Sequence, residues 1–401
     1  MKKCILVSEE LKLEIDDKAL YINGTEYTPK EEGEDFKVVA NKQKKDYYRK
    51  KLEKLLLSDN LLLLTGAGTS IGYGGKTMAD LWSGANKIDS EEGDFNQFCT
   101  AIDFNIAVKD LEALLSEAEI NIKSSKELPS WFKDFKIKIE AMIKEECSFD
   151  LNKFEDHLLL LQKLTQRKVS KSRLKIYNLN YDLSFESAAQ KGGFTIIDGF
   201  SFTQPRVFNG RYYDYDIVRR ENSRISAEEN YVDKVFHLYK PHGSVNWCKE
   251  GSNIVQKNKT EKFHAVMIYP NATKFEHSYE QPFFEVMSRF QIELRKTTST
   301  TLIISGFSLA DKHIMTMIKE AIRQNSSLNV MIVNRSIEYP GSDKDKEWSF
   351  YRELSEISPH VTLVAEEFAD FVKNIPYDIS KKPEDSFLEK LEQLIKSKEN
   401  E

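Results

Sequence analysis

The stretch Leu61-Leu62-Leu63-Leu64-Thr65-Gly66-Ala67-Gly68-Thr69-Ser70 decides the fold that we expect for this chain. Consecutive leucines are typical of a strand buried on both faces, as in a parallel sheet. The glycines that follow allow the backbone to turn sharply and to approach a ligand closely. Backbone N–H groups at such a turn bind phosphate or pyrophosphate. Ile71 stands where the usual G-x-G-x-x-G fingerprint has its third glycine, so a tight turn without a ligand is the alternative.

The composition limits the classes of protein to consider. The chain has 401 residues, of which 40% are hydrophobic and 30% charged, enough for one large domain with insertions or for two domains. The formal net charge of −6 does not favour direct nucleic-acid binding. No apolar run is long enough to span a bilayer, and the N-terminal one is too short for a signal peptide. We therefore expect a cytoplasmic protein without membrane contact.

The cysteines give no sign of a metal site. Cys4, Cys99, Cys147 and Cys248 lie far apart, and none belongs to a C-x-x-C pair. This spacing favours neither a zinc site nor a disulfide framework. No histidine stands near cysteines or carboxylates at metal-ligand spacing, so we expect no metal and no zinc.

Strand patterns and helix patterns alternate along most of the chain, which predicts an α/β fold with a Rossmann-like, doubly wound parallel sheet. Residues 1–40 are expected to form a β appendage with a hairpin around Asn23-Gly24, the favoured two-residue turn. Residues 41–380 would form the main domain, with a helical insertion at about 76–170, and residues 381–401 a charged helix. A lysine-rich helix at 42–57 should precede the leucine strand. Further strands are predicted at 174–178, 194–197, 235–239, 265–268, 301–304 and 328–333, and a helix at 311–324.

Polar residues follow three of these predicted strands, where ligand sites form in such sheets. Asn180 and Asp182 come after the strand at 174–178 and could bind ribose hydroxyls and a carboxamide. The alternative for Asp182 and its neighbours is an Asx turn that caps the helix beginning near Leu183.

His242 follows the strand at 235–239 and precedes a glycine. Its ordinary pKa lies near neutrality, which suits a general base, although a hydrogen-bonded structural histidine is equally compatible with the pattern. Gly306 and Ser308 follow the strand at 301–304, and Asn334 follows the next one. These residues could hold a nucleotide, or they could form a turn and a helix cap, with Asp311 favoured near the helix start by the dipole.

The order of these motifs resembles the sirtuin superfamily. The motifs are Gly66-Ala67-Gly68-Thr69-Ser70, Asn180-Tyr181-Asp182, His242-Gly243-Ser244, Gly306-Phe307-Ser308 and Asn334. The zinc module of protein deacetylases, with its two C-x-x-C pairs, is missing from the sequence. The chain resembles more closely the sirtuin-like NADases of bacterial antiphage defence, above all the sirtuin-like subunit of the sirtuin–HerA (Nezha) system. That resemblance rests on residues 66–82, 238–244, 268–270 and 371–376.

The resemblance implies an NAD+ hydrolase that cleaves the nicotinamide–ribose bond to nicotinamide and ADP-ribose. It implies that Asn180, Asp182 and His242 are catalytic, with His242 as the base. It implies that the pyrophosphate is held at the glycine turn and the adenosine half at the later motifs, by Gly66, Ala67, Gly68 and Ser70 and by Gly306, Ser308 and Asn334.

The resemblance also implies a large homo-oligomer that works with a HerA-type hexameric ATPase and depletes NAD+ in abortive infection. Two alternatives stay open, an NAD+- or ADP-ribose-binding regulatory subunit and an NAD-dependent deacylase. Glu112 and Glu117 of the helical insertion could reach the pocket, but we expect them on a solvated helix face.

Overall fold

The computed structural model describes residues 2–29, 35–88, 93–124, 127–148, 154–219, 231–257, 265, 281–342 and 345–376. Its centre is a parallel sheet in the order β13-β12-β11-β5-β6-β8-β7. The strands are β5 (Asn60–Thr65), β6 (Lys175–Asn178), β7 (Thr195–Ile197), β8 (Val235–Tyr239), β11 (Thr300–Ser305), β12 (Leu328–Asn334) and β13 (Val361–Ala365). The α/β, Rossmann-like prediction is thus confirmed, and β13 is a strand that the sequence reasoning missed. Of the strand predicted at 265–268, residues 266–268 lie outside the described residues.

The leucine strand lies in the middle of this sheet. Leu61 to Leu64 are each at most 1% exposed, because β5 is flanked by β11 and β6 and covered on both faces. From β5 the chain continues to β6 on one side, whereas β11, β12 and β13 build the other side. The carboxyl ends of β5 and β11 therefore meet at the point where the strand order reverses, which is where open α/β sheets bind ligands.

The N-terminal hairpin is present and is larger than predicted. Its turn has φ of 49° at Asn23 and 81° at Gly24, as a type I′ turn requires. The antiparallel strands are β1 (Lys3–Val7), β2 (Lys12–Ile15), β3 (Leu20–Ile22) and β4 (Thr25–Glu26). Since β1 pairs antiparallel with β13, they extend the central sheet to eleven strands. Helix α1 (Phe36–Leu55) follows. It covers residues 42–55 of the lysine-rich helix predicted at 42–57 and begins earlier than predicted.

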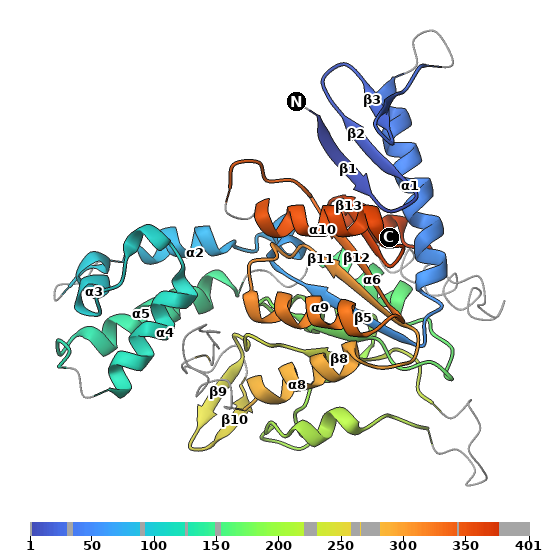
Figure 1. Cartoon of the computed structure of the whole chain (residues 1–401). Helices are drawn as coiled ribbons and strands as arrows, with labels where there is room; N and C mark the ends of the chain where they lie inside the picture. Colours follow the sequence, from blue (N-terminus) through green and yellow to red (C-terminus); the bar gives the residue numbers. More distant parts are fainter. Residues whose placement is uncertain are drawn as a thin grey trace, which may run out of the picture.

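Helices cover both faces of the sheet. Figure 1 shows α8 (Phe283–Leu294), α9 (Lys312–Gln324) and α10 (Asp345–Ile357) on the near face. On the other face α6 (Glu155–Leu164) packs against α7 (Ser184–Gly192) and α11 (Phe368–Asn374). No helix within the described ranges is long and apolar enough to cross a membrane.

Four further helices form a lobe beside the sheet, at the left of Figure 1. They are α2 (Met78–Ala85), α3 (Phe95–Ala101), α4 (Leu111–Lys123) and α5 (Phe132–Glu146). Their side chains make a hydrophobic core separate from that of the sheet, and Tyr181 and Val245 insert into it from the sheet side. We call α2 to α5 the helical lobe. Helix α6 also falls in the range predicted as the insertion, but it packs on the main body. The domain boundaries that we expected stay predictions.

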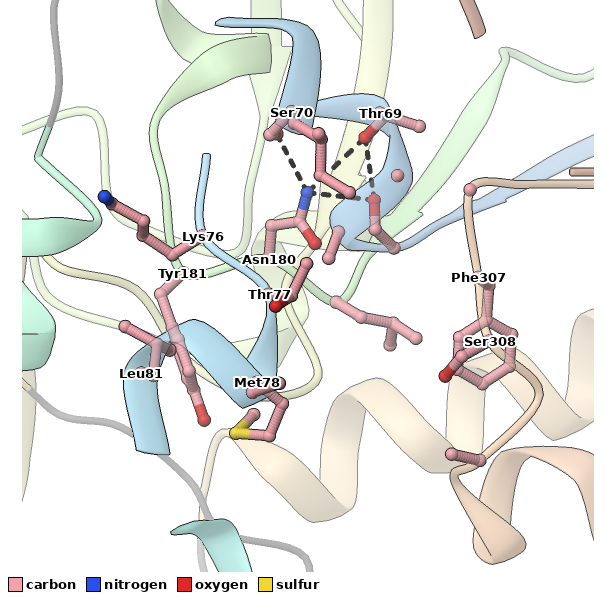
Figure 2. A pocket seen from close by; sticks show the side chains of 18 of the residues that line it. Thr69, Ser70, Lys76, Thr77, Met78, Leu81, Asn180, Tyr181, Phe307 and Ser308 are labelled. Carbon is pink, nitrogen blue, oxygen red and sulfur yellow. Dashed lines mark hydrogen bonds between the residues drawn. The ribbon is translucent and has the colours of Figure 1, made fainter. Parts of the chain in front are cut away.

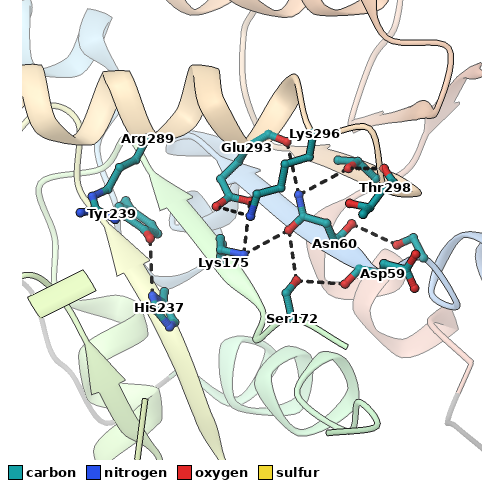
Figure 3. Close-up of polar contacts among 12 residues, drawn as sticks. Asp59, Asn60, Ser172, Lys175, His237, Tyr239, Arg289, Glu293, Lys296 and Thr298 are labelled. Carbon is teal, nitrogen blue, oxygen red and sulfur yellow. Dashed lines mark hydrogen bonds and ion pairs between the residues drawn. The ribbon is translucent and has the colours of Figure 1, made fainter. Parts of the chain in front are cut away.

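A polar network ties the amino ends of the strands together (Figure 3). The Asn60 amide nitrogen donates to the Glu293 carbonyl at 3.3 Å, and its oxygen accepts from Lys175 Nζ at 3.1 Å. Lys175 Nζ also lies 3.3 Å from a Glu293 carboxylate oxygen. The network joins β5, β6 and α8 at the edge of the sheet opposite the glycine turn. It therefore holds the register of the strands without occupying the edge where the predicted motifs lie.

Candidate active site

The turn after β5 packs directly against the turn after β11. A Cβ atom on Gly68 would lie 2.6 Å from the Gly306 Cα, and one on Gly66 would lie 2.9 Å from the Gly306 oxygen. Gly306 itself has φ of 64°, in the left-handed region. The Gly66 amide donates to the Ser305 carbonyl at 3.2 Å, and the Gly68 amide to the Gly306 carbonyl at 2.8 Å. The close approach of the two turns therefore explains these glycines without any ligand.

The glycine turn continues into the short 3-10 helices η1 (Ala67–Thr69) and η2 (Ile71–Tyr73). The Thr69 and Ser70 amides donate to the Gly66 and Ala67 carbonyls, both at 3.0 Å. Together with the amides of the two glycines, four backbone donors of the turn are already engaged. A role of the turn in binding a pyrophosphate stays a prediction.

Asn180 and Asp182 contact the glycine turn through their side chains, and Figure 2 shows the bonds that Asn180 makes. The Asn180 amide nitrogen donates to the Gly66 carbonyl at 3.1 Å and to Ser70 Oγ at 3.0 Å. Ser70 Oγ donates to Asp182 Oδ2 at 2.8 Å. The other oxygen of Asp182 accepts from the Ser184 amide at 3.0 Å, where α7 begins. The Asx turn of the alternative is therefore present at Asp182, just before the N-cap residue Leu183 of α7. The same carboxylate also closes a network with two other predicted site residues.

The buried side chain of Lys240 holds the loop after β6 in place through hydrogen bonds. Lys240 is 2% exposed, and its ammonium donates to the Tyr181 carbonyl at 3.2 Å and to Ser244 Oγ at 2.8 Å. It also donates to the Asp182 carbonyl and lies 3.3 Å from a Glu186 carboxylate oxygen. One cation thus fixes the loop after β6 relative to the loop after β8, and with it the relative positions of Asp182 and His242.

His242 lies between two carboxylates. Its Nε2 is 3.0 Å from Asp311 Oδ2, and its Nδ1 is 3.5 Å from Glu112 Oε1. Asp311 also caps α9, accepting from the His313 and Ile314 amides at 2.9 and 3.1 Å, as the helix-cap alternative expected. The same Glu112 oxygen accepts from the Tyr181 hydroxyl at 2.9 Å.

The carboxylates control the protonation of the imidazole. Burial lowers the pKa of His242, but the charge of Glu112 and the hydrogen bond to Asp311 outweigh it and raise the pKa to about 10. Burial likewise opposes the charged form of Asp311, yet the contact with His242 holds the pKa of that carboxyl below its ordinary value. The ring is therefore protonated at neutral pH in this arrangement. A ring already protonated cannot accept a proton, which corrects the premise that the pKa of His242 lies near neutrality.

One cavity of about 1660 Å³ joins these groups. Its wall includes every predicted site residue, namely Gly66, Ala67, Gly68, Ser70, Asn180, Asp182, His242, Gly306, Ser308 and Asn334. The helical lobe and the loop before α4 close one side of it with Met78, Leu81, Trp82, Val108 and Glu112. At the β12 end, Asn334 donates to the Tyr339 hydroxyl at 3.2 Å, and Glu366 is ion-paired with Lys44 at 2.9 Å. The cavity thus runs from the sheet to the lobe.

The position of one acidic group of this cavity was judged wrongly from the sequence. Glu112 was expected on a solvated helix face, and this expectation is wrong, because the carboxylate points to His242 and Tyr181. The apolar pattern of α4 marks only the side that packs into the lobe, so nothing local could have revealed the contact. Glu117, expected on the same solvated face, is half-buried and is not among the residues that line the cavity. Within the described part of the chain, no group of three or more metal-ligating side chains could hold a metal ion.

Part of the chain is SIR2-like. The SIR2-like domain family matches residues 174–354, from just before β6 into α10. The match contains Asn180, Asp182 and His242, together with the motifs after β11 and β12. The glycine turn lies outside it, although the structure brings that turn to the same cavity.

Solved structures of Sir2 proteins are similar over most of the chain but distantly. One is a mutant Sir2 homologue in complex with ADP-ribose, which is 13% identical with a TM-score of 0.39, over 81% of this chain and 95% of that one. Another is a Sir2 enzyme bound to a propionylated peptide, 14% identical with a TM-score of 0.34, over 81% and 96% of the two chains. A comparison with curated protein sequences found no match. Similarities this distant do not assign an activity.

Proposed function

We propose that the chain is an NAD+ glycohydrolase that cleaves the nicotinamide–ribose bond and releases nicotinamide and ADP-ribose. The observation that supports it best is that one cavity gathers all ten residues selected from the sequence. Four of them, in the glycine turn, lie outside the SIR2-like match and reach the cavity only through the fold. The volume of about 1660 Å³ exceeds that of ordinary pockets for drug-sized ligands, which leaves room for a dinucleotide.

The charges of the cavity suit this reaction. Nicotinamide leaves as a neutral molecule from a cationic ring, so the site needs no general acid for it. The ribose becomes positively charged, and fixed negative groups stabilise such charge in a water-poor site. Asp182 and Asp311 place two such carboxylates in the wall.

Each residue of the site would have its own role in binding or catalysis. Asp182 would hold the carboxamide, and Asn180 the nicotinamide ribose or the attacking water. His242 would accept a proton from a ribose hydroxyl or from the water after one of its carboxylate partners is displaced. Ala67, Gly68 and Ser70 would lie along the pyrophosphate, and Gly306, Ser308 and Asn334 along the adenosine half.

Release of nicotinamide and ADP-ribose from NAD+ by the purified protein tests the proposal. A positioned base contributes about 10²- to 10⁴-fold to a rate, so in the assembled, active protein we expect His242→Ala to lower turnover by about that factor and Asn180→Ala to lower it as well. His360→Gln is the matched control, because His360 is exposed and bonds to Asn329 away from the cavity. Full turnover by a folded and correctly assembled His242→Ala variant would contradict the assignment.

The biological setting that we propose rests on the resemblance to the sirtuin–HerA system. The chain would act in the cytoplasm as an antiphage effector that depletes NAD+ in abortive infection, assembled as a large homo-oligomer with a HerA-type ATPase. Co-expression with an ATPase encoded beside it, followed by native mass measurement and an NAD+ assay, tests the assembly and its effect. Two separate proteins with unchanged turnover would refute this part.

The same assay separates the alternatives. NAD+ binding by calorimetry without nicotinamide release would favour the regulatory subunit. Nicotinamide release that requires an acylated peptide would favour a deacylase.

A further inference from the structure

We propose that Glu112 is an inhibitory positioning residue, through which the helical lobe holds the His242 imidazole in a form that cannot accept a proton. The inference rests on the proposed function and adds to it a means of restraint. An NADase without restraint would consume the NAD+ of its own cell, and no feature of the sequence indicates how activity is limited.

The first support is the origin of the two carboxylates. Asp311 stands at the start of α9 in the main body, whereas Glu112 belongs to the first turn of α4 in the lobe. The lobe has its own hydrophobic core, so its contact with His242 depends on how the lobe is docked. Asp311 therefore stays beside the ring wherever the lobe lies, whereas Glu112 reaches the ring only when the helical lobe is docked on the main body.

The second support is the role of Tyr181 at the docking surface. Its ring packs into the lobe core, and its hydroxyl donates to the Glu112 oxygen that faces His242. Its carbonyl accepts from Lys240, which links it to the main body. Tyr181 therefore aligns the Glu112 carboxylate with the imidazole, and Val245 from the loop after β8 adds a second apolar contact with the lobe.

The third support is electrostatic. The charged groups that face the ring are Glu112 in α4 and Asp311, the residue before α9. His313 in turn interacts electrostatically with Asp311. Both ring nitrogens are within 3.5 Å of a carboxylate oxygen. A doubly paired ring is stable only while it carries both protons, so it has no lone pair to accept a proton from water or from a ribose hydroxyl. Its positive charge also opposes the charge that develops on the ribose.

The test compares Glu112→Gln with Glu117→Gln in the full-length protein. Glutamine keeps the size of the side chain and an oxygen that accepts from Tyr181, but it removes the charge. Glu117 lies on the same helix and does not line the cavity, so its variant is the matched control. Two quantities are measured, the titration midpoint of the His242 ring by NMR and nicotinamide release at pH 7. The His242 signal is assigned by its loss in His242→Gln.

We expect the midpoint of His242 to fall in Glu112→Gln and to stay in Glu117→Gln. Each pH unit of that fall raises the neutral fraction of the ring at pH 7 about tenfold. NAD+ cleavage by Glu112→Gln should therefore exceed that of the natural chain by about tenfold or more.

The outcomes distinguish this inference from the proposed function. An unchanged midpoint, or a natural chain that cleaves NAD+ at least as fast as Glu112→Gln, overturns the inhibitory role and leaves the NADase proposal intact. A lowered midpoint with no cleavage by any variant, alone or with the ATPase partner, overturns the proposed function and the inhibitory role with it.

Discussion

Replacing Gly68 by alanine tests the packing of the two turns at the centre of the site. The new Cβ would lie 2.6 Å from the Gly306 Cα and 2.9 Å from the Gly306 oxygen. Ordinary carbon contacts are about 3.5–4.0 Å, so the turns must separate by about 1 Å. Such overpacking costs about 1–3 kcal/mol. Separation also weakens the 2.8 Å bond from the Gly68 amide to the Gly306 carbonyl, worth about 1 kcal/mol.

The expected loss of unfolding free energy is therefore about 2–4 kcal/mol relative to a glycine-to-alanine change without a clash. Gly72→Ala provides that reference in the same turn, because a Cβ there would meet nothing within 4 Å. Both variants gain the same small benefit from a less flexible unfolded chain. Urea unfolding at one protein concentration, followed by tryptophan fluorescence, gives the two free energies. Equal values for Gly68→Ala and Gly72→Ala would refute the argument that close approach demands Gly68.

Two further predictions concern the buried charges of the site. Lys240→Met should lower the unfolding free energy by about 3 kcal/mol or more, because it removes the partner of the Glu186 carboxylate and of two backbone carbonyls. Adding Glu186→Gln should restore part of the loss in the same urea assay. A Lys240→Met variant as stable as the natural chain would contradict the role of the ammonium. The raised pKa of His242 predicts a stability that is fully present below its ordinary pKa of 6.5 and is lost as the pH rises toward about 10, by up to about 1.4 kcal/mol per pH unit. Unfolding of the natural chain and of His242→Gln across this range should show the steeper decline in the natural chain, and parallel curves would contradict a raised pKa.

Local patterns were sufficient for most of the sheet. Each strand that the sequence predicted wholly within the described residues is present. Burial on both faces gives the central strands continuous apolar runs, which can be recognised from the local sequence. Strands β1, β2 and β13 of the central sheet were missed, and so was the separate pair β9 (Trp247–Glu250) and β10 (Asn253–Gln256). Strand β13 pairs with β12 and with β1 from the other end of the chain, so long-range pairing is what places these segments in the sheet.

The candidate site divides in the same way. The sequence by itself determined which motifs follow strand ends, and parallel strands bring such motifs to one edge of the sheet, so all ten selected residues line one cavity. Only the tertiary structure decided how these residues are bonded. In the folded chain, the glycine amides of the turn after β5 donate to carbonyls of the turn after β11. Glu112 of the helical lobe lies beside His242. The physical reason is that protonation and hydrogen bonding depend on groups within a few ångströms in space. In this chain those groups come from segments far apart in the sequence.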